Sequence, residues 1–302
     1  MSATATAVEI AGVRLAHPDK ELYPDAHVAK RDLARYAEAI APRMLPHVAR
    51  RLISLVRCPE GQGAPCFFQR HTLPGNLPAI HRFKADGKQD SDAYLYIEDL
   101  PGLIGLAQMG VLEIHVWGSH VDDIDRPDRM VFDLDPAEDV PFATVKAAAL
   151  RLRDLLAAMQ LESLPMLTGG KGIHVVVPLQ PRHGWDVVKA FSGALAQRMA
   201  ADQPDRFVAT MSKAKRHGRI FIDYFRNDKA ASAIAPYSTR ARAGAPLAWP
   251  VSWQSLPRIK AANEVTLANH KRRLAGPDPW AGYAKIRQTL ESSVLKALDI
   301  DA

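Results

Sequence analysis

Two aspartates separated by a single residue are the first feature of this sequence that could do chemistry. Asp133 and Asp135 stand in the run Met-Val-Phe-Asp-Leu-Asp-Pro at 130–136, which is typical of a strand that enters a turn. Because side chains alternate between the faces of a strand, both carboxylates project to one side, while Phe132 and Leu134 point into a core. Neighbouring carboxylates repel unless a positive charge neutralises them, and their oxygens suit hard cations such as Mg²⁺ or Mn²⁺. The pattern predicts a metal site, with two solvated acids at a strand end as the alternative.

A third aspartate, Asp223, lies within the otherwise apolar run Arg-Ile-Phe-Ile-Asp-Tyr-Phe at 219–225. Burying an unpaired carboxylate is costly, so such a residue needs a cation, a metal ion or a helix N-terminus as its partner. A structural salt bridge to an arginine is the alternative. Together with Asp133 and Asp135, this residue completes the three carboxylates that two-metal nucleotidyl transfer requires. The hypothesis requires the three side chains to converge, with no arginine permanently filling the space between them.

Two further segments could bind phosphate. In the run Thr-Gly-Gly-Lys-Gly-Ile-His at 168–174, the glycines allow a close approach of the backbone to an anion, and Lys171 would add a positive charge. Since a strand rather than a helix follows, this turn is not a Walker loop, and a plain connection between strands is the alternative. In the run at 237–242, Arg240 and Arg242 share one face of an extended segment. They could clamp a triphosphate, or they could form a solvated run of charge.

The distribution of charge favours a polyanionic partner. The formal net charge is +6, and the segment 205–242 alone holds nine lysines and arginines against three acids. The segment 43–84 holds seven such cations against one acid. Two concentrated basic patches suit phosphate binding better than an evenly basic surface does. In the second patch, Phe67 and Phe68 near Arg70 could stack on bases, although such a pair more often places one ring in the core.

Composition places the chain among ordinary globular proteins. It has 302 residues, of which 47% are hydrophobic and 24% are charged, so it can bury a sizeable core. The two cysteines, Cys58 and Cys66, predict no disulfide framework and are expected to be reduced thiols of a cytosolic protein. The N-terminus lacks the features of a signal peptide, and no apolar run is long enough to span a bilayer. A cytoplasmic location without a membrane partner is therefore expected.

The elements that must position these residues are mixed along the chain. Helices are expected where apolar residues recur at helical spacing, and strands where short apolar or β-branched runs occur. The expected helices span 28–40, 100–109, 142–160, 186–200 and 282–298, and the expected strands span 52–56, 94–97, 112–117, 129–134, 173–177 and 219–225. Pro42 is expected to end the first helix, and a loop is expected at 84–92. Without strict β-α-β alternation, this order indicates an α+β fold.

Several motifs occur in an order that resembles one family. They are PDKELYP at 18–24, PCFFQRH at 65–71, EIHVWGS at 113–119, VFDLDP at 131–136, TGGKGIHVVVPL at 168–179, SKAKRHGRIFIDYFRN at 212–227 and APYSTRAR at 235–242, and the 278–280 region is also similar. Together they resemble the primase-polymerase domain of the bacterial ATP-dependent DNA ligase of non-homologous end joining, within the archaeo-eukaryotic primase superfamily. The resemblance implies a primase-like core with mixed or antiparallel sheets flanked by helices. We expect a single domain at 1–302, with an N-terminal lobe at about 1–110, a catalytic core at 111–245 and a C-terminal extension at 246–302.

The resemblance implies a role for each matching residue. Asp133, Asp135 and Asp223 match the catalytic acids that bind the metal ions. The positions that match the family's contacts to the nucleotide are His115, Thr168, Gly170, Lys171, His174, Arg216, Ser238 and Arg240, with Thr168 where the family often has serine. The positions that match its contacts to DNA are Lys20 and Lys30 for a recessed 5′-phosphate, Phe67 and Phe68 for stacking on the template, and the neighbouring Arg70.

The implied activity is DNA-directed nucleotidyl transfer to 3′ ends at gaps or double-strand breaks. The family implies two Mn²⁺ or Mg²⁺ ions with Mn²⁺ preferred, and ribonucleotide or deoxynucleotide triphosphates as substrates, often the former. It also implies DNA with a 5′-phosphorylated gap or end, ligase and nuclease domains, and the end-binding Ku protein as partners at the bacterial nucleoid. The sequence departs from the family in showing no ligase motif and no nuclease part, so a stand-alone primase or gap-filling polymerase is an alternative. A non-catalytic DNA-end-binding module and a metal-dependent nuclease are the others.

Overall fold

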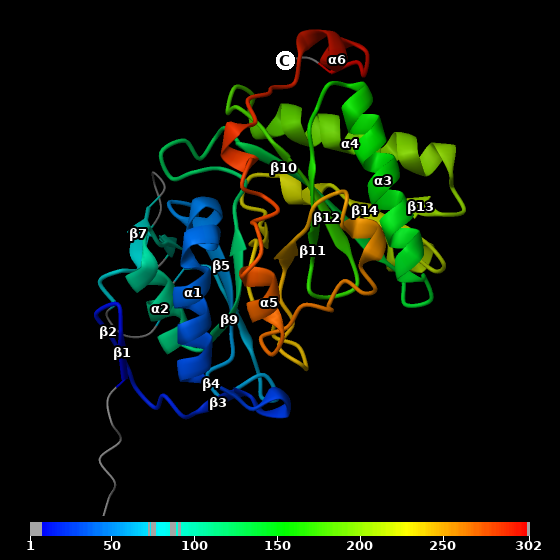
Figure 1. Ribbon diagram of the computed structural model, residues 1–302. Helices are drawn as coiled ribbons and strands as arrows, with labels where there is room; N and C mark the ends of the chain where they lie inside the picture. Colours follow the sequence, from blue (N-terminus) through cyan, green and yellow to red (C-terminus); the bar gives the residue numbers. More distant parts are fainter. Residues whose placement is uncertain (1–7, 72, 74–76, 85–88, 90–91, 301–302) are drawn as a thin grey trace, which may run out of the picture. The chain divides into compact units, whose positions relative to one another are not determined.

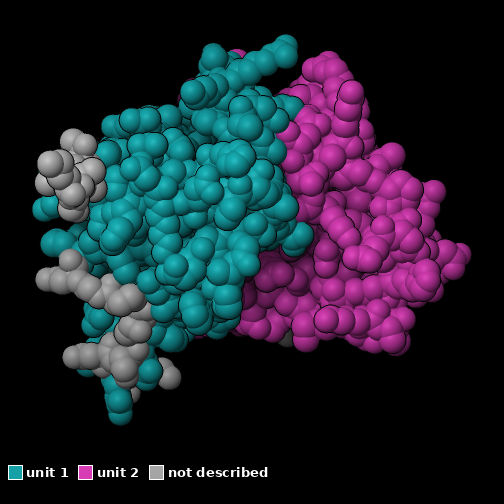
Figure 2. All heavy atoms as spheres, turned by 90° about the horizontal axis from the view of Figure 1, so that it is seen from below, with its two compact units in different colours: residues 1–116, 234–247, 265–276 teal, residues 117–233, 248–264, 277–302 magenta. Residues whose placement is uncertain are grey.

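The computed structural model describes residues 8–71, 73, 77–84, 89 and 92–300. Its contacts divide the chain into two compact units, which are coloured separately in Figure 2. The first unit comprises 1–116, 234–247 and 265–276, and the second comprises 117–233, 248–264 and 277–302. The expected single domain with boundaries near residues 110 and 245 stays a prediction. None of the described helices is both long and apolar enough to cross a membrane.

A six-stranded sheet forms the centre of the first unit (Figure 1). Its strands run in the order β15-β9-β5-β8-β7, and β6 pairs with β5 beside this path. Strand β5 is antiparallel to β6, β8 and β9, and β7 is antiparallel to β8. The bounds are β5 (Ile53–Arg57), β6 (Phe67–Gln69), β7 (His81–Phe83), β8 (Tyr94–Tyr96), β9 (Val111–Val116) and β15 (Ala233–Ile234).

Helices α1 (Lys30–Val48) and α2 (Leu100–Gln108) pack against each other, and α2 also packs against β9. The prediction that Pro42 ends the first helix is wrong, because α1 continues through it to Val48. A proline inside a helix removes one backbone hydrogen bond. Ile40, Met44 and Val48 are nevertheless buried on either side of the proline. Tertiary packing of this apolar face therefore maintains the helix beyond the point that local propensity would allow.

Cys58 and Cys66 form a disulfide, so the expectation of two reduced thiols is wrong. The cause is the register of the β5–β6 hairpin, in which Arg57 at the end of β5 lies opposite Phe67 near the start of β6. The next residue outward on each strand is a cysteine, which places their Cα atoms 4.3 Å apart. Such a distance lies near the short end of the range that a disulfide can bridge.

A second six-stranded sheet forms the centre of the second unit, in the order β13-β14-β10-β12-β11-β16. All pairs are antiparallel except β13–β14, so the sheet is mixed. Helices α3 (Phe142–Ala158) and α4 (Trp185–Asp202) pack against it (Figure 1). The bounds are β10 (Arg129–Pro136), β11 (Leu164–Leu167), β12 (Ile173–Pro178), β13 (Phe207–Val208), β14 (Ile220–Asp223) and β16 (Trp249–Pro250).

The expected helix over 282–298 is wrong. Only η6 (Tyr283–Lys285) and α6 (Ser292–Lys296) are helical in this segment. Between them, Gln288 bonds to the backbone of other segments of the second unit. Its side-chain nitrogen donates to Pro178 O at 2.7 Å and to Glu162 O at 2.9 Å, and its backbone carbonyl oxygen accepts from Gln180 N at 2.7 Å. These tertiary bonds hold the segment extended where its composition alone favours a helix.

The other expected helices and strands are confirmed to within a few residues. In the loop expected at 84–92, residues 85–88 and 90–91 lie outside the described residues. The remaining short elements are β1 (Val8–Ile10), β2 (Val13–Leu15), β3 (Glu21–Tyr23), β4 (Val28–Ala29), α5 (His270–Leu274), η1 (Pro24–Ala26), η3 (Lys213–Lys215), η4 (Phe225–Asn227) and η5 (Leu256–Arg258).

Candidate active site

The strand pair β10–β14 brings two of the three predicted acids together. Asp133 lies directly opposite Asp223 in the antiparallel register. Asp135 is two residues further along β10, so alternation places it on the same face as Asp133. On the other face, Phe132 and Leu134 are fully buried, as the sequence predicts. The apolar face thus anchors the strand while the opposite face carries the carboxylates.

The electrostatic environment of Asp223 is unfavourable for its charge. Burial raises the pKa of its carboxyl, and the neighbouring charge of Asp133 acts in the same direction. The guanidinium of Arg226 and a hydrogen bond from Phe225 N, at 3.0 Å, lower the pKa but do not cancel the rise. The ionised form of Asp223 is therefore less favourable here than in water.

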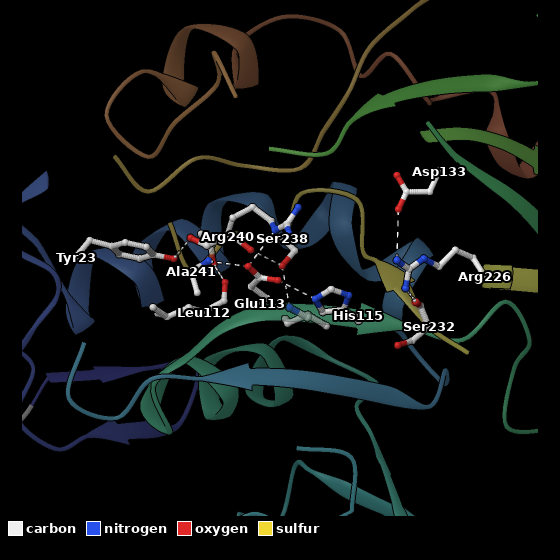
Figure 3. A network of polar contacts seen from close by, with 12 residues as sticks. Tyr23, Leu112, Glu113, His115, Asp133, Arg226, Ser232, Ser238, Arg240 and Ala241 are labelled. Carbon is white, nitrogen blue, oxygen red and sulfur yellow. Dashed lines mark hydrogen bonds and ion pairs between the residues drawn. The ribbon is translucent and has the colours of Figure 1, made fainter. Parts of the chain in front are cut away.

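Basic side chains lie against all three acids. Arg226 Nε is 3.1 Å from Asp223 Oδ2, and Arg226 Nη2 is 3.6 Å from Asp133 Oδ2 (Figure 3). Arg216 Nη1 is 3.5 Å from Asp135 Oδ2. Arg226 thus contacts both Asp133 and Asp223, although 40% of its side chain is exposed.

The carboxylates can be tested for their fit to a divalent cation. Within the described ranges, the side chains form no group of three or more His, Cys, Asp and Glu that could hold a metal ion. Asp133 and Asp223, however, present hard oxygen donors from directly opposite strand positions, and burial together with the charge of Asp133 raises the pKa of Asp223. Both properties fit Mg²⁺ or Mn²⁺. Asp135 shares their face but is paired with Arg216, and its side chain is 54% exposed.

The glycine turn between β11 and β12 is closed by Thr168. Its Oγ1 donates to Gly172 O at 3.0 Å and accepts from Gly170 N at 3.3 Å. Lys171 extends to the exposed Glu138, with Nζ 3.0 Å from Oε1. At the end of the turn, a Cβ on Gly172 would lie only 2.4 Å from Leu134 O, so only glycine fits here. The turn is therefore pressed against the strand that carries Asp133.

His174, another of the predicted nucleotide contacts, also lies beside the acids. His174 pairs with Asp133 in the β10–β12 register, and its Nε2 lies 3.4 Å from Asp133 Oδ1. The histidine is almost completely buried. The second unit thus brings together Asp133, Asp223 and His174.

The first unit holds a separate group of predicted nucleotide contacts (Figure 3). His115 Nε2 lies 2.8 Å from Glu113 Oε2, and Arg240 Nε lies 3.0 Å from Glu113 Oε1. Ser238 Oγ accepts a hydrogen bond from Ile114 N at 2.9 Å. The predicted site residues therefore fall into two clusters, one in each unit, and the first is built around Glu113.

The predicted DNA contacts all lie in the first unit. Phe67 and Phe68 on β6 are 52% and 54% exposed, so the alternative that one ring belongs to the core is wrong. The Arg70 guanidinium lies 5.1 Å from the centre of the Phe68 ring. Lys20 is paired with Glu60 at 2.8 Å, while Lys30 Nζ donates to Ala16 O at 2.8 Å.

Lys30 carries a partly desolvated positive charge. It is buried, and burial lowers the pKa of its ammonium group. The charge of Lys20 lowers the pKa further, because the two positive charges repel each other. An anion between two such cations would relieve both effects.

Three residues of these clusters have no role in the sequence-based interpretation. Glu113 lies two residues before His115 on one strand, so alternation alone would have placed both on one face. Arg226 follows Asp223 by three residues within a motif already recognised. Asn227 Oδ1 accepts from Val131 N at 2.7 Å, and its Nδ2 donates to Val131 O at 2.8 Å and to Tyr224 O at 3.0 Å. No local signal in the sequence predicts these three hydrogen bonds.

Comparisons with known proteins give a consistent match. A family model described as "LigD, primase-polymerase domain" matches residues 29–280. The multifunctional non-homologous end joining protein LigD of Pseudomonas aeruginosa is 38% identical over 300 residues, which cover 98% of this chain and 36% of that protein. The multifunctional non-homologous end joining DNA repair protein LigD of Mycobacterium tuberculosis is 33% identical over 252 residues, covering 81% of this chain and 33% of that protein. The chain thus spans about a third of the length of these curated relatives.

The fold matches a solved structure as well. The polymerase domain from Mycobacterium tuberculosis ligase D in complex with DNA has a TM-score of 0.80 and 30% identity to this chain. The match covers 87% of this chain and 94% of that one. The predicted α+β fold, with antiparallel and mixed sheets flanked by helices, is thereby confirmed.

Proposed function

The chain belongs to the LigD primase-polymerase domain family, and we propose that it adds nucleotides to 3′ ends of DNA in the repair of breaks and gaps. The observation that carries this proposal is the placement of Asp133 opposite Asp223 on neighbouring strands, with Asp135 on the same face. An acid-rich face next to a glycine turn is the arrangement that nucleotidyl transfer needs, because a triphosphate must be held beside the catalytic acids.

Asp133, Asp135 and Asp223 would hold the divalent cations. When bound, such cations would stabilise charge on the α-phosphate and favour loss of the proton from the attacking 3′-hydroxyl. The number of ions, proposed to be two, and a preference for Mn²⁺ follow from the family resemblance. The raised pKa of Asp223 supports this role, since a poorly neutralised acid pair gains from added positive charge.

The nucleotide contacts are proposed on the family resemblance, residue by residue. In the second unit, Lys171 and Arg216 would offset triphosphate charge, and the backbone of the glycine turn would approach the phosphates. Thr168, Gly170 and His174 would shape that side of the site. His115, Ser238 and Arg240 match positions that bind the triphosphate and the sugar in the family.

DNA is the proposed polymeric substrate. The similar polymerase domain from Mycobacterium tuberculosis ligase D is in complex with DNA in its solved structure. The exposed Phe67 and Phe68, with Arg70 beside them, suit stacking on template bases. Lys20 and Lys30 suit a recessed 5′-phosphate. Further partners proposed on the resemblance are ligase and nuclease domains and the Ku protein, in the bacterial cytoplasm at the nucleoid.

Primer extension on a 5′-phosphorylated gapped duplex tests the proposal, with ribo- and deoxynucleotides compared under Mg²⁺ and Mn²⁺. We expect extension by the wild type and none by Asp135→Ala. DNA binding, measured by fluorescence anisotropy, should persist in the variant because the Asp135 side chain is largely exposed. Asp154→Ala removes another exposed acid, on α3, and serves as the matched control.

Three results would contradict parts of the proposal. Wild-type extension by Asp135→Ala would remove that residue from the metal site. DNA binding without extension by the wild type would favour a non-catalytic end-binding module. Cleavage of the DNA without any thermal stabilisation by nucleotides would favour a nuclease.

A further inference from the structure

We propose that Glu113 is a positioning residue, which orients the side chains of His115 and Arg240 for binding the incoming nucleotide. The inference rests on the proposed function, because those two side chains are assigned to the nucleotide there. It adds a residue whose role neither the sequence motifs nor the catalytic acids supply. All contacts that carry it lie within the first unit.

The carboxylate of Glu113 serves both side chains at once (Figure 3). Its Oε2 lies 2.8 Å from His115 Nε2. Its Oε1 lies 3.0 Å from Arg240 Nε and accepts from Ala241 N at 2.9 Å. The Glu113, His115 and Arg240 side chains are only 8%, 18% and 14% exposed, so water competes little for these bonds.

The charge state of Glu113 determines what each partner can do. Burial alone would raise the pKa of this carboxyl. Hydrogen bonds from His115 and Ala241 N and the charges of Arg240 and His115 overcome that effect and lower it to about 2. The group is therefore ionised at neutral pH and can only accept hydrogen bonds.

Because Glu113 can only accept hydrogen bonds, it determines which atoms of His115 and Arg240 face it. The nitrogen of His115 that faces Glu113, Nε2, must carry a proton, so a bond from this ring to a nucleotide would use Nδ1. For Arg240, the carboxylate lies against the Nε edge of the guanidinium, which sets how this group is turned. Glu113 thus selects the orientation of both side chains.

Other bonds attach the 238–241 segment to β9 and to β3 without Glu113. Ile114 N donates to Ser238 Oγ at 2.9 Å, and Thr239 Oγ1 donates to Leu112 O at 2.5 Å. Tyr23 Oη donates to Arg240 O at 2.9 Å. Neutral hydrogen bonds therefore hold most of the segment, and Glu113 adds its bond to Ala241 N and the direction of the His115 and Arg240 side chains.

Glu113→Gln tests the inference, because it keeps the size of the side chain and removes its charge. Tyr23→Phe is the matched control, since it removes a bond to the same segment without touching the Arg240 guanidinium. We expect the KM for ATP in primer extension, with Mn²⁺ present, to rise by about tenfold or more in Glu113→Gln. In Tyr23→Phe it should change by less than about twofold, and the affinity of both variants for DNA should stay near that of the wild type.

A double-mutant cycle separates positioning from a general loss of stability. Both variants are compared at a temperature at which circular dichroism reports them folded. In an Arg240→Gln background, Glu113→Gln should add much less to the KM than it does in the wild type, because one of its two targets is gone. An unchanged KM in Glu113→Gln, or an equal rise in Tyr23→Phe, would overturn the inference while the proposed function stands. A wild type that neither extends primers nor binds ATP would overturn both.

The wild type allows a second measurement that does not depend on a folded Glu113 variant. In ¹⁵N NMR spectra of histidine-labelled protein, the His115 signals are assigned by their loss in His115→Gln. We expect Nε2 of His115 to be protonated at neutral pH. A ring with a bare Nε2 and a proton on Nδ1 alone would show that the contact with Glu113 is not the one described, and the inference would fail.

Discussion

Substitution of Gly172 tests whether the glycine turn sets the geometry of the catalytic strands. A Cβ at this position would lie 2.4 Å from Leu134 O, whereas ordinary contacts begin at 3.4 Å. Gly172→Ala must therefore move β12 away from β10 by roughly 1 Å, or loosen the turn that Thr168 closes. Either movement acts on the strand pair that places His174 opposite Asp133.

The size of the effect follows from this displacement. Forcing one extra methyl group into a closely packed strand pair costs about 1–3 kcal/mol of unfolding free energy. For a chain of 302 residues, that loss corresponds to a fall in Tm of roughly 2–5 °C. A displacement of about 1 Å near reacting groups can lower the rate of catalysis by about 100-fold. We therefore expect activity to fall more steeply than stability.

The assay combines primer extension with thermal unfolding. Gly282→Ala is the control in the same unit, because no atom lies within 4 Å of its added Cβ and its φ of −85° suits alanine. We expect that control to retain wild-type Tm and kcat/KM. If Gly172→Ala matched the wild type in both quantities, close packing of the turn on β10 would not be what positions the acids.

Two further predictions concern buried polar groups. The pKa of Glu113 falls from 4.5 to about 2 on folding. Its ionised form therefore stabilises the folded protein by about 3 kcal/mol above pH 4.5. This contribution is lost as the pH falls towards 2. Urea unfolding should thus show Glu113→Gln less stable than the wild type at pH 7 and nearly equal to it at the acid limit, and a constant difference would contradict the reasoning. Asn227→Ala removes three bonds to Val131 and Tyr224, and we expect the unfolding free energy to fall by roughly 3 kcal/mol. A loss below about 0.5 kcal/mol in calorimetry, the effect of a neutral surface substitution, would show that water replaces the amide.

The strands that carry the acids were predictable because their patterns are local. Alternation assigned Phe132 and Leu134 to the core and the two neighbouring aspartates to the opposite face. The position of Asp223 opposite Asp133 was not predictable in the same way. It depends on the register of two strands far apart in sequence, which local periodicity does not encode.

The errors in the predicted elements share a physical cause. Pro42 does not end α1, and the segment around Gln288 is not helical, because tertiary partners outweigh local propensity in both places. The disulfide escaped prediction for a related reason. Cys58 and Cys66 meet only because the hairpin register sets them opposite each other. Around Pro42 and Gln288 the deciding contacts are tertiary, whereas the two cysteines, eight residues apart, meet through the pairing of β5 with β6.

Arg226 bears most directly on the proposed metal site, since an arginine that permanently filled the gap between the acids would exclude a cation. Its guanidinium contacts Asp223 and Asp133 at 3.1 Å and 3.6 Å. Two observations argue against a permanent brace. The side chain is 40% exposed, so it can leave the acids without a large desolvation cost. The pKa of Asp223 also stays raised despite this arginine, which means that one guanidinium does not offset the burial and mutual repulsion of the acid pair. A divalent cation would neutralise the pair more completely, and we expect its binding to displace Arg226.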